Sequence, residues 1–436
     1  MSAEPETIIT DDNIHKLVQS KVYIFISEYR LPTDLKNKKL EDWDISRVTN
    51  MDRLFKHVAG DYIGSGHTLE DIDLNKWDVS HVKSMKEMFY GCANFNQPLD
   101  KWNVGNVTNM EGMFVRCFHF DGKTIKDWDV SQVTNMARMF EHCEFRNSEH
   151  SEVDIANWNV GNVENMSCMF KKSTFNSPIG NWNVGKVEDM SYMFANELYC
   201  ETMFNQNIGK WDVRKVKTME GMFESADKYN QPFCCWDVRK VENMERMFKK
   251  AKIFNQSLCH FNVDGVKNMS GMFDGCSNFN QPLNNWDVRN VKSMRAMFRH
   301  AEKFNQPLVT WKVDKSTCDV KFIFYGAKNM VSPTWMNRLN TPELTKLKHS
   351  VNMKSFKEYV RDAKYMPPPG RDGKYSSIYW MGKHFKTAKR SFLKRKIEGE
   401  MNLRSTPTTA KSAPSLLKKS QRRSKSKRRA SFGGKM

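Results

Sequence analysis

The chain has 436 residues, of which 39% are hydrophobic and 12% aromatic, and its formal net charge is +19. It contains no run of about 18 apolar residues, and residues 1–12 are polar and acidic, so we expect neither a membrane span nor a secretory signal peptide. Ten cysteines without a signal peptide favour a reducing compartment. We therefore expect an intracellular protein, in the cytoplasm or nucleus, or in a virion.

Residues 1–40 are predicted to form an N-terminal helical cap. Apolar residues recur at helical spacing after Thr10 and Asp11, either of which is a suitable residue to begin a helix. An array of repeats needs such a terminal element because the outer face of its first unit would otherwise expose apolar side chains.

Residues 41–330 carry a repeat in which an aromatic residue is followed twelve residues later by Phe. Self-similarity at a period of about 20–50 residues indicates a solenoid, a propeller or an array. In the last five units the period is 25 without interruption, and the final pair, Trp311 and Phe324, is one residue longer. The ten regular pairs are Trp43–Phe55, Trp77–Phe89, Trp102–Phe114, Trp128–Phe140, Trp158–Phe170, Trp182–Phe194, Trp211–Phe223, Trp236–Phe248, Phe261–Phe273 and Trp286–Phe298.

One unit shows how each repeat is interpreted. Residues 286–288, Trp-Asp-Val, alternate apolar and polar, which is typical of a strand. Val291, Met294 and Met297 then follow at three-residue steps, which indicates a turn of α or 3₁₀ helix. A Phe-Asn-Gln-Pro turn ends the unit. The sequence thus predicts an α/β repeat solenoid of about eleven coils, each a short parallel strand plus a helical turn, with buried Trp and Phe columns.

These residues carry a family likeness. Residues 95–99 (Phe-Asn-Gln-Pro-Leu), residues 128–136 (Trp-Asp-Val-Ser-Gln-Val-Thr-Asn-Met) and the Met139-Phe140 pair closely resemble the BspA-like repeat, a relative of leucine-rich repeats. That family occurs in bacterial surface proteins and lipoproteins, in protists and in large DNA viruses. The resemblance covers about residues 41–330. It implies a curved α/β solenoid of leucine-rich-repeat type that binds proteins or surfaces, and it says nothing about the basic tail.

Seven of the ten cysteines fall into two groups by position. Cys92, Cys117, Cys143 and Cys276 each lie three residues after a repeat Phe, where other units have Ala or Ser. We interpret this position as a small, buried packing site rather than a redox or metal site. Cys234 and Cys259 are one period apart and Cys235 is adjacent, so an interaction among these three is left open. No histidine lies at zinc-like spacing from them, and we expect no metal site.

The outward position of the expected strand holds Asp or Asn in all ten regular units. Such residues could form an acidic binding stripe, but the exchange of Asp for Asn favours capping of the following turn through backbone hydrogen bonds. Two and three residues later, the C-terminal units become basic. We consider these residues either a partner-binding strip or a solvated face: Arg214, Lys215, Arg239, Lys240 and Arg289.

The chain ends in a predicted C-terminal cap, residues 331–370, and a basic tail, residues 371–436. The tail has 20 Lys and Arg against three Asp and Glu, a net charge of +17, which leaves +2 for residues 1–370. Spacing predicts an amphipathic helix over 377–397. Beyond it, a low-complexity basic cluster resembles a nuclear-import or nucleic-acid patch, with Ser431 as a candidate phosphorylation site: Lys418, Lys419, Arg422, Arg423, Lys425, Lys427, Arg428 and Arg429.

No enzyme signature stands out. Residues 64–66, Gly-Ser-Gly, lack the third glycine and the following helix of a nucleotide loop, and we expect no catalytic residue and no cofactor. The sequence favours a non-enzymatic interaction protein whose solenoid recognises an unknown protein partner and whose tail localises it or contacts nucleic acid or an import receptor. The alternative is a nucleic-acid-packaging or virion-associated protein in which the tail is the active part.

The tail interpretation predicts a strong salt dependence. If the basic cluster contacts phosphates, nucleic-acid affinity should fall steeply with salt and show no sequence preference, because binding releases counterions. A titration at several salt concentrations, with the full chain and with residues 1–415, measures this. Equal affinities for the two chains, or no salt dependence, would show that the tail is not a nucleic-acid contact.

Overall fold

The computed structural model describes residues 6–22, 30–57, 69, 72–145, 153–196, 203–314, 316–331, 333 and 335–336. All of them belong to the first of two compact units, residues 1–361. The predicted helix over 377–397, the basic cluster, Ser431 and nearly all of the C-terminal cap lie outside the described residues. Those interpretations therefore stay predictions.

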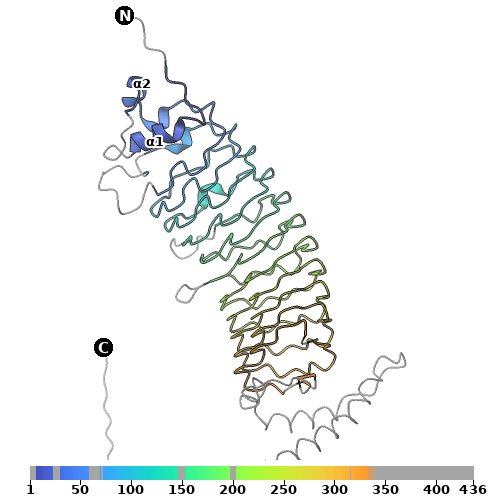
Figure 1. Cartoon of the computed structure of the whole chain (residues 1–436). Coiled ribbons are helices and arrows are strands. Elements are labelled where there is room, and N and C mark those ends of the chain that lie inside the picture. The colour runs from blue at the N-terminus through green and yellow to red at the C-terminus, as the bar shows by residue number, and fades with distance from the viewer. Residues whose placement is uncertain are drawn as a thin grey trace, which may run out of the picture. The chain divides into compact units, whose positions relative to one another are not determined.

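The described part of the N-terminal segment contains two helices. Helix α1 spans Ile14–Val22 and buries Ile14 and Leu17, and α2 spans Thr33–Lys36. Short 3₁₀ helices lie at Leu40–Asp42 (η1), Leu74–Lys76 (η3) and Lys123–Ile125 (η4). In Figure 1 the coils follow α1 and α2 one after another in chain order.

Asp11 caps the first coil. Its carboxylate accepts the backbone N–H groups of Thr49 and Asn50 at 2.7 and 2.9 Å, and the Thr49 hydroxyl at 2.7 Å. In later coils the equivalent N–H groups bond to the preceding coil, as Lys83 does to the Thr49 carbonyl. No coil precedes the first one, so the Asp11 carboxylate supplies the hydrogen-bond acceptor that a preceding coil supplies elsewhere.

The repeats are built from β-turns rather than from a strand and a helical turn, so the predicted α/β solenoid of strand–helix coils is wrong. In the described residues the repeats form no sheet, and a single bridged residue per coil, from Asn50 to Asp319, pairs in parallel with its neighbours. Apart from the short 3₁₀ helices η1, η3 and η4, their described residues contain no helix. The three-residue steps come from turn hydrogen bonds, such as Met139 N–H to the Met136 carbonyl at 3.2 Å.

Positive φ angles explain why no helix forms. Arg138 and His142 have φ near +60°, whereas an α-helix needs φ near −60°. Positive φ at the third position of a turn is the mark of a type II turn. The same two positions are left-handed in most coils, so the Met-rich segment folds into consecutive turns.

Backbone hydrogen bonds join each coil to the next. N–H groups at every second residue from Met136 to His142 donate to every second carbonyl of the next coil, from Asn165 to Lys171, at 2.8–3.0 Å. The N–H groups between them close turns within their own coil. Each segment thus satisfies its buried backbone groups without a continuous strand.

The aromatic columns are buried, as the spacing predicts. Trp182 is 4% exposed and Phe194 1%. Neighbouring Phe rings stack; Phe114 and Phe140, for example, have centroids 5.8 Å apart. Methionines fill the space beside them, and Met136 and Met139 are fully buried. Such a core cannot form within one coil, so the coils depend on their neighbours.

An indole hydrogen bond links successive coils. The Nε1–H of Trp182 donates to the carbonyl of Ile155 at 3.0 Å, and the same carbonyl closes a turn by accepting the backbone N–H of Trp158. Nine tryptophans from Trp77 to Trp311 make this bond at 2.8–3.1 Å. Trp43, in the first coil, has no preceding coil, and its buried Nε1 has no described partner.

The small-residue position is a core position, as predicted. Cys92, Cys117, Cys143 and Cys276 are buried, and each thiol donates to a carbonyl of the preceding coil at 2.9–3.1 Å. Burial raises the pKa of Cys117, Cys143 and Cys276. These thiols are therefore protonated packing groups.

In the coil of Phe261, a histidine replaces the indole as the donor to the preceding coil. Phe261 stands where other coils have Trp and carries no N–H. The preceding residue, His260, instead places its Nε2 2.5 Å from the carbonyl of Phe233, which is the carbonyl that a tryptophan at position 261 would reach. His260 therefore supplies the donor that Phe261 lacks.

Replacing His260 with Ala should leave the Phe233 carbonyl with one partner fewer and lower the free energy of unfolding by about 1 kcal/mol. Asn285→Ala is the matched control, because Asn285 occupies the same position one coil later, where Trp286 already donates to Leu258. Urea unfolding of the two variants measures the difference. An equal loss in both would contradict the assigned role of His260.

Candidate binding surface

The outward Asp and Asn residues close turns and do not form a free acidic stripe. In all ten regular units the side-chain oxygen accepts the backbone N–H two residues later at 2.9–3.2 Å. This confirms the capping interpretation. The residues are Asp44, Asp78, Asn103, Asp129, Asn159, Asn183, Asp212, Asp237, Asn262 and Asp287.

The arginines of the predicted strip are paired with these aspartates. Arg214, Arg239 and Arg289 each hold the Asp two residues earlier through two parallel N–H···O contacts of 2.5–2.9 Å. Their side chains stay about two-thirds exposed, at 64–69%. Because each guanidinium already has a carboxylate partner, these arginines contribute less free positive charge than their number suggests.

Lys215 and Lys240, the lysines next to these arginines, have no carboxylate partner among the described residues. At the same position in other coils, an asparagine ties two coils together: Asn290 Nδ2 donates to the Asp264 carbonyl at 2.8 Å, and Asn106 and Asn162 make the equivalent bond. Lys215 and Lys240 are exposed there. In the part of the chain that the structure describes, neither ammonium group has a hydrogen bond or an ion pair. These coils therefore present free charge in place of a structural link.

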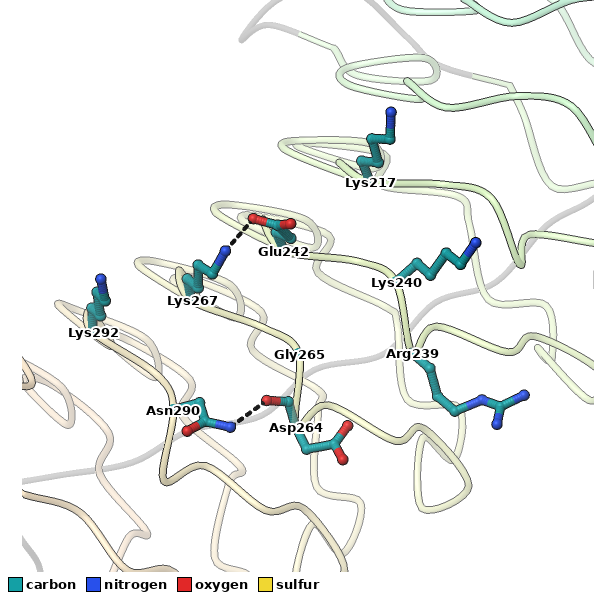
Figure 2. A pocket seen from close by; sticks show the side chains of 9 residues that line it. All are labelled: Lys217, Arg239, Lys240, Glu242, Asp264, Gly265, Lys267, Asn290 and Lys292. Carbon is teal, nitrogen blue, oxygen red and sulfur yellow. Dashed lines mark hydrogen bonds and ion pairs between the residues drawn. The ribbon is translucent and has the colours of Figure 1, made fainter.

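A shallow hollow of about 560 Å³ is lined by four successive coils of this region (Figure 2). It forms at Gly265, which has no side chain at the position held by Lys240 and Asn290 in the coils on either side. A Cβ at Gly265 would lie 2.7 Å from the carbonyl oxygen of Arg239, so the position requires glycine. The lining residues are Lys217, Arg239, Lys240, Glu242, Asp264, Gly265, Lys267, Asn290 and Lys292.

The hollow is predominantly positive, with five basic and two acidic side chains. Lys217 pairs with Glu188 and Lys267 with Glu242 (Figure 2 shows the second pair). Hydrogen bonds from these lysines lower the pKa of Glu188 and Glu242, and those from Arg239 lower the pKa of Asp237. The carboxylates in these pairs stay ionised at neutral pH. Among the described residues Lys240 and Lys292, like Asp264, have no ion-pair partner. We call the exposed surface of residues 214–292 that carries these cations the basic face.

The structure brings together only part of the predicted strip. Arg239 and Lys240 line the hollow, whereas Arg214, Lys215 and Arg289 lie on the basic face outside it. The prediction missed Lys217, Lys267 and Lys292. These lysines all follow the second Val of their repeats, so aligning the units by that Val would have revealed them as one column.

The three cysteines left open by the sequence are exposed. The thiols of Cys234 and Cys235 are 3.6 Å apart, while Cys259 contacts Ser257 Oγ at 3.2 Å. Within the described ranges, no group of three or more His, Cys, Asp or Glu side chains is arranged to hold a metal ion. Nor does any helix in those ranges have the length and apolar character to cross a bilayer.

Comparison with known proteins identifies one family. The model of a family described as "Mycoplasma protein of unknown function, DUF285" matches five overlapping stretches: residues 8–61, 22–151, 144–260, 233–337 and 256–362. These matches span the repeats and are consistent with the BspA-like resemblance. No curated protein and no solved structure matches the chain.

The asparagine column predicts a stabilising substitution. In Lys240→Asn, the new amide should donate to the carbonyl of Arg214, as Asn290 does to Asp264, and should raise the free energy of unfolding by about 0.5 kcal/mol relative to Lys240→Ala. Both variants lose the same charge, so the comparison isolates the hydrogen bond. Urea unfolding provides the measurement, and equal stability of the two variants would refute the structural role of this column.

Proposed function

The chain belongs to the DUF285 family of repeat proteins, and we propose that it is a non-enzymatic interaction protein whose basic face binds an acidic segment of a partner protein. The observation that carries the proposal is the pair of free lysines at the hollow, Lys240 and Lys292. The other lining cations, Lys217, Arg239 and Lys267, are each paired with a carboxylate. A stack of repeats offers an extended surface for such contacts.

The type of free cation supports a carboxylate-bearing partner. Arginine suits planar, two-point recognition of phosphate, but Arg214, Arg239 and Arg289 use that geometry on their own aspartates. The remaining free groups are lysine ammoniums, which are flexible point charges. They can follow acidic side chains that present no fixed geometry.

The acids in the hollow disfavour nucleic acid. A nucleic-acid strand carries one negative charge about every 3.4 Å, so it would bring phosphates close to Glu242 and Asp264. A protein segment can place its own donors against these two carboxylates and its acidic side chains against the lysines. Mixed charge on the surface thus fits mixed charge on the ligand.

Zero-length cross-linking tests the proposal on the full chain. A Glu-rich peptide treated with carbodiimide should form amide bonds with Lys240 and Lys292, which mass spectrometry can map. Lys240→Glu combined with Lys292→Glu should lower the peptide affinity about tenfold, because each reversal removes one attraction and adds one repulsion.

Arg47→Glu combined with Lys83→Glu is the matched control. These residues occupy the same two repeat positions, beside Val48 and Val82, in the first coils. This variant should leave the affinity within about twofold of the original, since the first coils lie beyond the screening length of the hollow. Cross-links confined to residues 371–436, or equal losses in both double variants, would overturn the proposal. Competition by duplex DNA at the same lysines would favour a nucleic-acid ligand instead.

A further inference from the structure

Cys234 and Cys235 occupy the centre of a rigid turn. The turn is closed by a hydrogen bond from Trp236 N–H to the Phe233 carbonyl, and both flanking aromatic residues are buried, with Phe233 1% and Trp236 2% exposed. Cys235 N–H also donates to the Gly209 carbonyl of the preceding coil at 3.0 Å. The two exposed thiols are therefore fixed to the core at both ends of a four-residue segment.

Close packing beneath the turn restricts it further. A Cβ at Gly209 would lie 2.4 Å from the Pro232 carbonyl oxygen and 3.3 Å from the Cys234 nitrogen. The preceding coil thus supports the turn from below. Such support matters because a chelating pair holds a metal well only when its geometry exists before binding.

The distance between the two sulfur atoms suits a tetrahedral metal ion. Zinc–thiolate bonds of about 2.3 Å at tetrahedral angles place two sulfurs about 3.8 Å apart, and the Cys234 and Cys235 sulfurs are 3.6 Å apart. In the structure the Cys235 thiol donates to the Cys234 sulfur, and the Cys234 thiol donates to the Gly209 carbonyl at 3.5 Å. A metal ion would replace both thiol protons.

A disulfide between the same residues is disfavoured. Adjacent Cα atoms are about 3.8 Å apart, whereas disulfides usually need about 4.4–6.8 Å. An S–S bond here would be strained and readily reduced. The pair therefore persists as two thiols available for binding.

We propose that Cys234 and Cys235 form a two-thiolate chelate for a soft divalent metal ion such as Zn²⁺. Binding forms two metal–sulfur bonds and releases two protons to solvent, with no change in the oxidation state of the metal. With two protein ligands, the remaining coordination positions are open to water or to a ligand group from a partner. This distinguishes the site from a closed structural zinc site with four protein ligands.

The next coil provides a matched control. Cys259 occupies the same repeat position as Cys234 and is also exposed, but its neighbour is His260, whose ring is engaged with the Phe233 carbonyl. Cys259 is therefore a single accessible thiol in an equivalent backbone setting. Any metal affinity that depends on the adjacent pair should be absent from it.

Cobalt and zinc titrations of the reduced full chain test the proposal. Co²⁺ should produce a thiolate-to-metal charge-transfer band that one equivalent of Zn²⁺ removes. Cys234→Ser and Cys235→Ser should each lower the zinc affinity at least ~100-fold, because a chelate loses its effective-concentration advantage when one arm is removed. Cys259→Ser should bind within about twofold of the original chain.

Two results would overturn the proposal. Unchanged zinc affinity in either Cys234→Ser or Cys235→Ser would show that the pair does not chelate. A comparable loss in Cys259→Ser would show a three-thiolate site or unspecific thiol binding. Thermal unfolding of the metal-free variants checks that each serine substitution leaves the stack intact.

Discussion

The stack depends on the hydrogen bond from an indole N–H to a backbone carbonyl of the preceding coil. A buried donor must find an acceptor, and the acceptor here also closes the turn that begins the preceding unit, as Ile155 does. The bond therefore fixes the distance between coils and the conformation of the turn together. A phenylalanine can fill much of the same volume but leaves this carbonyl with one partner fewer. The pairing of Phe261 with His260 shows that the donor is needed even where the indole is absent.

The sequence predicted the repeat, the buried columns, the small cysteine position and the Asp and Asn turns, because each rests on residue type at a fixed spacing. It did not predict the local backbone. Residues such as Met136 and Met139 recur at three-residue steps both in a helical turn and in a β-turn, so spacing alone cannot distinguish them. The distinguishing signal is the residue type at the two positions with positive φ, those of Arg138 and His142. In the described coils these positions never hold a β-branched side chain where φ is positive, because such side chains tolerate that region poorly.

The binding surface was only partly predictable because the sequence shows which residues are basic but not which of them are paired with acids. Counting basic residues selected Arg214, Arg239 and Arg289, but their charge is largely compensated by Asp two residues earlier. That compensation depends on side-chain geometry and not on composition. Conversely, Lys240 matters because asparagine at its position would join two coils. On part of one face, lysine thus replaces the asparagine that would bond to the preceding coil, and the surface gains an unpaired positive charge. Aligning the repeat units by position reveals this substitution.

Each coil makes the same pattern of hydrogen bonds to the coil before it and to the coil after it, so a unit inserted in register meets surfaces that already fit it. An in-frame duplication of one 25-residue unit in the gene would therefore lengthen the protein without a new kind of interface. Copy number becomes a heritable means of changing length, while single substitutions at positions such as Lys240 change what each added unit displays. The Asp11 carboxylate, which meets only the first coil, would be unaffected by such growth.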